Sequence, residues 1–292
     1  MDMISVNRRP ENLWRFLQFP LTRIVLAVLP IVLLAVLLFS AANAAHLHGI
    51  AGAAVQLSVG LGACLVYILY VRLIERRKVS ELSAGDFLPQ FSKGFLLGFL
   101  LISATILVLW MSGIYSVLGM NPLGMVAAPL LGAIGSAFLE EIVIRGVLFR
   151  IIEESLGTWL ALGLSALIFG LLHGLNPGAT WVSILAIALE SGVLLAAVYI
   201  YARQLWIGIG LHCAWNFSEG GIYGASVSGG KGHGLLSAQF QGADLLTGSQ
   251  FGPEASIVAV AICFIAGGIF LLLARRRGHI IAPFWQRAQT GS

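Results

Sequence analysis

Long apolar runs, separated by short polar segments, dominate the chain. A helix needs about 20 apolar residues to cross a hydrocarbon core of roughly 30 Å, and each of these runs reaches that length without a charged residue. The pattern therefore predicts an all-α protein whose helices span a membrane. The runs are Ile24–Ala45, Ile50–Val71, Gly94–Leu139, Ser155–Leu189 and Ala255–Ala274.

Two of the runs are too long for a single span, and each contains a helix breaker. Asn121-Pro122 interrupts the third run and Asn176-Pro177-Gly178 interrupts the fourth, so each run predicts two helices joined by a tight turn. A further segment, Leu205–Ser218, is apolar but short. It crosses the membrane only if neighbouring helices shield its ends from lipid. We therefore expect a polytopic bundle of about eight transmembrane helices.

Basic residues indicate the orientation, because Lys and Arg are retained next to short cytoplasmic loops. If both termini are cytoplasmic, all but two of the 17 basic residues lie on that side. The exceptions are Arg145, inside a helix, and Lys231, in an outer loop. We predict an integral multi-pass protein of a bacterial-type plasma membrane. The cytoplasmic basic residues are Arg8, Arg9, Arg15, Arg23, Arg72, Arg76, Arg77, Lys78, Lys93, Arg150, Arg203, Arg275, Arg276, Arg277 and Arg287.

Composition agrees with this assignment. Hydrophobic residues make up 58% of the chain and charged residues 10%, with a mean hydropathy of +0.92, which is more apolar surface than a soluble core can bury. The net charge of +4 reflects the cytoplasmic loops, so we infer no nucleic-acid partner. Ala42-Asn43-Ala44 resembles a signal-peptide cleavage site, but the preceding stretch is long enough to span, and we predict a retained helix.

The chain shows no internal repeat and no second domain, so we expect one membrane-embedded domain over residues 1–292. The longest connection between spans, residues 219–254, is rich in Gly and Ser and lies on the outer face. Loops of this length are often functional. The segment either covers the outer mouth of the bundle as a lid or re-entrant hairpin, or acts as a flexible connector.

Two adjacent carboxylates lie inside the predicted fourth helix. A charged group in the hydrocarbon region costs on the order of 3 kcal/mol, so it rarely occurs without a partner or a function. Arg145 follows Glu141 by four residues, which places both on one helix face, whereas Glu140 points about 100° away. We therefore predict that Glu141 pairs with Arg145 and that Glu140 faces the bundle interior as an unpaired base.

Two histidines and an asparagine occur on other predicted helices. His173 lies near the outer end of the fifth, and His212 and Asn216 share a face of the seventh because they are four residues apart. With Glu140 they supply what peptide hydrolysis needs. A carboxylate takes a proton from water, a histidine orients that water or protonates the leaving amine, and a histidine with an asparagine stabilises the oxyanion.

The same residues leave a metal-dependent mechanism open. Two histidines and a glutamate are ligand types of catalytic zinc sites, and the ligands here would be Glu140, His173 and His212. The chain contains no H-E-x-x-H helix, so the sequence itself requires no cofactor. Glu190, in the predicted sixth helix, is a further intramembrane carboxylate, which either pairs with this cluster or hydrogen-bonds structurally while protonated.

Three motifs, in this order on separate apolar helices, resemble those of the CPBP family, which contains CAAX prenyl proteases, bacteriocin-processing enzymes and Abi-like proteins. The resemblance covers about residues 120–220, which we expect to be the catalytic core. The motifs are Glu140-Glu141-x-x-x-Arg145, Phe169-x-x-x-His173 and His212-x-x-x-Asn216.

This resemblance implies an intramembrane endopeptidase that cleaves a membrane-tethered peptide or protein, including substrates with a prenylated CAAX end. It implies that Glu140 activates water, with His173 beside it, and that His212 and Asn216 form the oxyanion site. Glu141 completes the catalytic set. The residues expected to support this set are Arg145, Phe169 and Glu190.

Two other classes of function remain open. Some relatives are thought to act by binding partners, so the chain could be a non-catalytic immunity or scaffold protein of the membrane. Buried glutamates and histidines also build proton relays, which would make it a proton-coupled transporter. The sequence shows neither the inverted repeat nor the matched broken helices that transporters often have.

Overall fold

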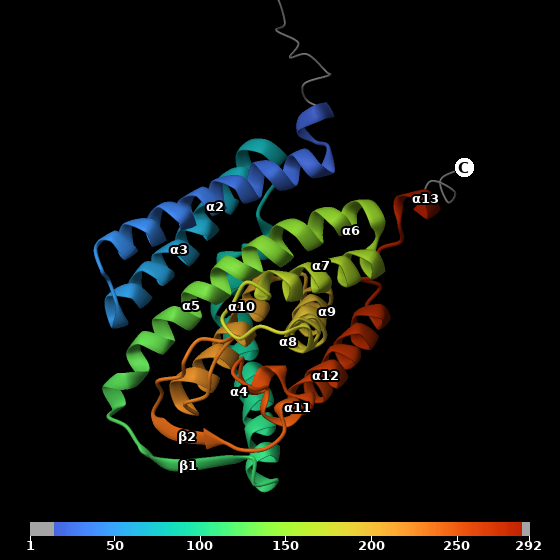
Figure 1. The fold of residues 1–292 in the computed structure, drawn as a ribbon. Coiled ribbons are helices and arrows are strands. Elements are labelled where there is room, and N and C mark those ends of the chain that lie inside the picture. Colours follow the sequence, from blue (N-terminus) through green and yellow to red (C-terminus); the bar gives the residue numbers. More distant parts are fainter. Residues whose placement is uncertain (1–14, 288–292) are drawn as a thin grey trace, which may run out of the picture.

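The computed structural model describes residues 15–287, and in this range the protein is a bundle of helices (Figure 1). Six helical segments of the described chain are long and apolar enough to cross a membrane, and Thr158–His173 is a shorter apolar helix. The fold is thus an all-α polytopic bundle. Its main helices are α2 (Pro20–Ala44), α3 (Gly49–Tyr70), α4 (Phe87–Met111), α5 (Ala127–Glu141), α6 (Arg150–Leu156), α7 (Thr158–His173), α8 (Trp181–Ile187), α9 (Val193–Ala202), α10 (Leu205–Asn216) and α12 (Ile257–Arg276).

Several of the long segments contain a π-helical stretch, in which each turn holds an extra residue. Such a stretch joins α5 to α6 and another joins α8 to α9, so each pair forms one continuous segment across the bundle. π-Helical turns are frequent at functional sites because they redirect side chains. The stretches are η1 (Val71–Glu75), η5 (Ile142–Phe149), η6 (Ala188–Gly192) and η7 (Phe217–Ile222).

Small residues let the helices approach closely. A Cβ atom added at Gly60 on α3 would lie 2.3 Å from the carbonyl oxygen of Gly135 on α5. A Cβ atom added at Gly98 on α4 would lie 2.2 Å from the carbonyl oxygen of Leu211 on α10. Lipid is as apolar as these helices, so close packing of this kind supplies much of the association energy. The helices that carry the predicted site, α5 and α10, are thereby fixed in position.

The tight turn predicted at Asn121-Pro122 is wrong. Helix α4 already ends at Met111, and the chain then forms a strand, β1 (Tyr115–Met120), which pairs antiparallel with β2 (Leu236–Phe240). The apolar pattern could not show this, because the partner strand lies more than 100 residues away in the outer segment. The second predicted break is present: α7 ends at His173, and α8 begins after Thr180, whose side chain caps it.

Residues 223–256, which we call the outer cap, are folded against the bundle. They contain β2, α11 (Asp244–Thr247) and η8 (Pro253–Ala255). The Phe251 side chain is buried, in a cluster with Phe169 of α7. In Figure 1 the cap and both strands lie at the end of the bundle opposite to α13 (Phe284–Arg287).

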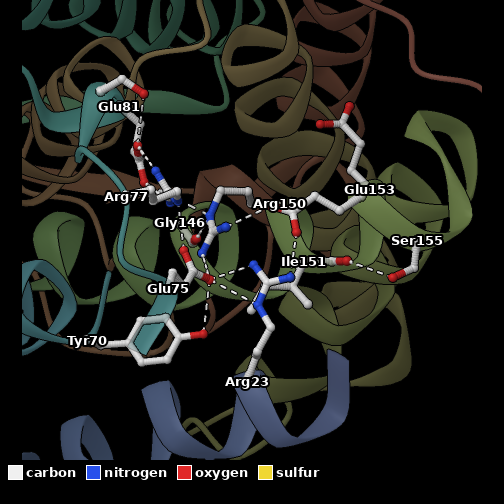
Figure 2. A network of polar contacts seen from close by, with 12 residues as sticks. Arg23, Tyr70, Glu75, Arg77, Glu81, Gly146, Arg150, Ile151, Glu153 and Ser155 are labelled. Carbon is white, nitrogen blue, oxygen red and sulfur yellow. Dashed lines mark hydrogen bonds and ion pairs between the residues drawn. The ribbon is translucent and has the colours of Figure 1, made fainter. Parts of the chain in front are cut away.

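A network of ion pairs joins several elements at the other end of the bundle (Figure 2). Glu75 is its centre, with carboxylate oxygens 2.6 Å from Arg23, 2.7 Å from Arg150 and 2.8 Å from Arg77. These contacts tie the start of α2 to η1 and α6. The network, which we call the inner clasp, consists of Arg23, Glu75, Arg77, Glu81, Arg150, Glu153, Glu154 and Arg203.

The inner clasp accounts for basic residues that the sequence analysis placed in the cytoplasm. Its four arginines are matched by four glutamates, so the cluster is neutral as a whole. Arg8 and Arg9 lie outside the described residues, as do both chain ends. The number of helices that cross the membrane and the side on which the termini lie therefore stay predictions.

Glu75→Gln is expected to destabilise the protein by about 3 kcal/mol, because it leaves buried arginines without their carboxylate. Glu154→Gln is the matched control, since Glu154 also pairs with Arg23 and Arg150, but its side chain is 43% exposed against 3% for Glu75. The control should cost less than about 1 kcal/mol. Melting temperatures in detergent measure both, and equal shifts would contradict the assignment of Glu75 as the centre.

Candidate active site

Glu140 and Glu141 are the last residues of α5, directly before the π-helical stretch η5. The predicted pair is confirmed: Arg145 Nη1 donates to Glu141 Oε1 at 2.8 Å, and both side chains are buried. Arg145 Nη2 also donates to the carbonyl oxygens of Ser191 at 2.9 Å and Gly192 at 3.2 Å. Glu141 is thus neutralised and held, and Arg145 ties α5 and η5 to η6.

The aromatic ring of Phe169 lies between Arg145 and the two histidines. The guanidinium carbon of Arg145 lies 4.7 Å from the centre of this ring, which is within the range of a cation–π contact. The rings of His173 and His212 lie 4.6 and 6.2 Å from it, centre to centre. Phe169 therefore acts as a packed support that sets the positions of both histidines.

His212 lies between the two carboxylates. Its Nδ1 lies 3.1 Å from Glu141 Oε1, and its Nε2 lies 3.8 Å from Glu140 Oε2. A carboxylate only accepts hydrogen bonds, so Nδ1 carries the proton and donates it to Glu141. This hydrogen bond orients the ring, and Nε2 faces Glu140.

His173 is oriented in a similar way by its own helix. Its Nδ1 lies 2.9 Å from the carbonyl oxygen of Phe169, to which it donates, and its Nε2 lies 3.8 Å from Glu140 Oε2. Two histidine nitrogens from different helices thus face one carboxylate oxygen. That oxygen is buried and has no hydrogen-bond partner among residues 15–287, as expected for a carboxylate that points away from Arg145.

Asn216 lies one turn beyond His212, at the end of α10. Its Nδ2 donates to the hydroxyl of Ser136 at 3.4 Å. Sequence analysis missed Ser136, although it lies four residues before Glu140 and therefore on the same face of α5. Asn216 and Ser136 together extend the site from Glu140 toward the cap.

The structure places Glu190 apart from Glu140 and the histidines. It is buried in η6, where the hydroxyl of Ser191 donates to its carboxylate. The link to the site is indirect, because the carbonyl oxygens of Ser191 and Gly192 accept from Arg145. Of the two interpretations left open for Glu190, the geometry favours the structural hydrogen bond.

Two cavities flank the site. The lateral cavity, of about 530 Å³, lies between α2, α5 and α7, and Glu140 and His173 form part of its otherwise mainly apolar wall. The outer cavity, of about 590 Å³, is bounded by the α2–α3 turn, α5 and the cap, and both Ser136 and Asn216 line it. The site therefore has one side open toward lipid and one toward the outer end of the bundle.

Zinc is not supported by the geometry. Within residues 15–287 no three side chains of His, Cys, Asp or Glu converge as a metal site requires. Glu140, His173 and His212 have the ligand types but not the arrangement, and we derive no step through a metal.

Two further carboxylates, which the sequence analysis did not single out as site residues, are buried where the cap meets the bundle. Glu219 accepts from the Trp215 indole at 3.0 Å and from the Glu254 backbone at 3.1 Å, and Glu254 accepts from the hydroxyl of Ser228 at 2.8 Å. Burial raises the pKa of both groups above the ordinary value. Neighbouring Glu254 raises the pKa of Glu219 further, whereas His173 and Ser228 lower that of Glu254.

The stability of the protein is expected to fall as the pH rises above about 4.3, the ordinary pKa of glutamate. Between this value and the raised pKa, the folded state binds more protons than the unfolded state, so raising the pH favours unfolding. Melting temperatures between about pH 5 and pH 8 measure how steeply stability falls with pH. Glu219→Gln should make this dependence flatter, and an unchanged dependence in this variant would contradict the raised pKa of Glu219.

Comparison with known proteins identifies the region around the site. Residues 122–218 match the model of one family, described as type II CAAX prenyl endopeptidase, Rce1-like. No curated protein and no solved structure is significantly similar to the chain. The matched range contains all three motifs, which confirms the resemblance inferred from them. Residues 122–218 are therefore similar to type II CAAX prenyl endopeptidases of the Rce1-like family, and they lie in a chain with six helices long and apolar enough to cross a membrane among its described residues.

Proposed function

We propose that the protein is an intramembrane endopeptidase in which Glu140 activates the attacking water. One observation carries the proposal: a buried carboxylate oxygen without a hydrogen-bond partner of its own faces Nε2 of His173 and Nε2 of His212, each at 3.8 Å. These gaps are too long for direct hydrogen bonds. They suit a water molecule held by all three groups. The family match supports the protease class.

In the proposed reaction, Glu140 takes a proton from water while the water oxygen bonds to the substrate carbonyl carbon. The resulting oxyanion lies against His212 and Asn216, which share one face of α10. The Asn216 amide donates a hydrogen bond to it, and Nε2 of His212 donates when the ring, held between the carboxylates of Glu140 and Glu141, is doubly protonated. The carbon–nitrogen bond then breaks, and the proton held by Glu140 passes to the leaving amine. His173 orients the water, and its own orientation depends on the Phe169 carbonyl.

The substrate class follows from the lateral cavity. Its wall is mostly apolar, it is formed in part by the lipid-facing helix α2, and it reaches Glu140 and His173. A substrate held in the membrane by a lipid chain or an apolar helix could approach through it without leaving the bilayer. We therefore propose a membrane-tethered peptide or protein as substrate, of which a prenylated CAAX end is one type.

A cleavage assay in detergent tests the proposal. The purified protein is given lipidated fluorogenic peptides, with and without a strong zinc chelator, and cleavage that persists under chelator is expected. Loss of cleavage under chelator that zinc restores would instead establish a metal-dependent mechanism. Absence of cleavage for every lipidated peptide, with the protein folded, would favour the scaffold alternative.

A further inference from the structure

The cap contributes one large buried side chain to the surroundings of the active site. Phe251 has 1% exposure and belongs to the same packed cluster as Phe169 of α7, at 2%, and Ile144 of η5, at 1%. Phe169 is also the ring against which His173 packs, with the two ring centres 4.6 Å apart. The cap and the active site therefore share this cluster, and the ring of Phe169 is the member that belongs to both.

The turn between α7 and α8, which begins directly after His173, also packs against the cap. Gly229 of the cap approaches this turn so closely that an added Cβ atom would overlap the carbonyl oxygen of Pro177. Its φ of +79° is a conformation that favours glycine. On the same turn, a Cβ atom added at Gly178 would lie 3.1 Å from the Cβ of Gln250. The end of α7 is thus held by the cap from outside its own helix.

The position of Phe251 is itself fixed by hydrogen bonds on both sides. Its carbonyl oxygen accepts from the backbone of Gly229 at 2.8 Å. Three residues further on, the Glu254 carboxylate accepts from the backbone and the hydroxyl of Ser228, at 2.7 and 2.8 Å. The Glu254 backbone donates to the carboxylate of Glu219 at 3.1 Å. Because Glu219 belongs to η7, the direct continuation of α10, these bonds also tie the cap to the helix of the second histidine.

From these contacts we infer that Phe251 is a positioning residue for His173. The inference rests on the proposed function and adds to its machinery a residue of the cap, outside the matched range 122–218. Phe251 holds the cluster around Phe169 and the end of α7. It thereby keeps His173 Nε2 at 3.8 Å from Glu140 Oε2, the gap proposed to hold the attacking water. At such a site a displacement of about 1 Å can cost ~10²-fold in rate.

Steady-state kinetics on a lipidated fluorogenic peptide separate positioning from stability. Phe251→Ala is compared with Phe149→Ala, since Phe149 is equally buried but packs against Tyr199 in a different cluster. Both variants should lower the melting temperature by similar amounts, because both remove a buried ring. Where both are folded, only Phe251→Ala is expected to lower kcat, by ~10²-fold, with KM changed less than about twofold.

A conservative variant guards against simple loss of the fold. Phe251→Leu keeps most of the buried volume and should restore most of kcat. If Phe251→Ala does not fold, Phe251→Leu and Phe149→Leu carry the same comparison, and only the first should lower kcat. Equal losses of kcat at the two positions, or an unchanged kcat in the folded Phe251 variants, would overturn the inference.

Hydrogen exchange at the end of α7 tests the inference without any substrate. The Asn176 amide donates to the carbonyl oxygen of His173 at 3.1 Å, so its exchange reports whether this end is held. Exchange in the segment 170–180 should be about tenfold faster in Phe251→Ala than in the wild type, and unchanged in Phe149→Ala. Unchanged exchange in Phe251→Ala would overturn the inference. Absence of cleavage by the folded wild-type protein would overturn the proposed function instead, while exchange still decides whether Phe251 positions His173.

Discussion

Glu140→Gln is expected to lower the rate of peptide cleavage by ~10²–10⁴-fold, the range for loss of a general base. The amide keeps the size of the side chain but cannot accept the proton of water. The fold should survive, because Glu140 Oε2 has no hydrogen-bond partner among the described residues. Initial rates on a lipidated fluorogenic peptide, together with melting temperatures, measure both effects.

Two comparisons make this result specific to Glu140. Glu154→Gln removes the same charge at the clasp end and should keep nearly full activity. His173→Ala should lose activity strongly as well, because His173 Nε2 faces the same carboxylate oxygen. If Glu140→Gln folds and cleaves at the normal rate, Glu140 is not the base. If the cellular phenotype of the wild-type protein survives Glu140→Gln, the scaffold function is favoured.

Arg145→Leu is expected to lower the free energy of unfolding by about 3–5 kcal/mol, the cost of leaving a buried charge without its partner. Arg145 is fully buried, and it is the only arginine or lysine paired with Glu141 among the described residues. It also donates to two carbonyl oxygens of η6, which lose their donor. Thermal unfolding in detergent measures this loss of stability.

The double variant Glu141→Gln, Arg145→Leu separates stability from catalysis. With Glu141 neutral, no uncompensated charge remains, so this variant should be more stable than Arg145→Leu alone. It should still cleave poorly, because His212 loses the charged acceptor of its Nδ1 proton. Strictly additive losses of stability would show that Glu141 and Arg145 do not act as a pair.

The helices and the candidate site could be predicted because membrane insertion makes local patterns informative. Apolar runs give the spans directly, and a charged residue inside one of them is conspicuous. The spacing of Glu141 and Arg145 was enough to predict their ion pair. The sequence also indicated that Glu140 lacks a partner, since it points to a different face of the helix. Each of these inferences uses residues that are close together in the chain.

The remaining features depend on contacts between distant segments. Strand β1 lies in an apolar stretch with no alternation of its own, and only its pairing with β2 defines it. Ser136 looks like an ordinary small residue until α10 brings Asn216 beside it. Glu219 and Glu254 lie at the two ends of the Gly- and Ser-rich segment that the sequence predicted as a connection between spans, and their burial follows from the folding of the cap against the bundle. Local periodicity carries no information on such contacts.

The inner clasp also has a consequence for the order of events during synthesis. The contacts of Arg23 join it to Glu75, 52 positions further along the chain, and to Glu154, 131 positions further along. Helix α2 can therefore insert early, whereas the contacts of its first turn are completed only after more than half of the chain has left the ribosome. Until Glu75 is made, Arg23 carries an unpaired positive charge, the form that topology signals require. The same arginine thus serves first as an orientation signal and later as a structural bond.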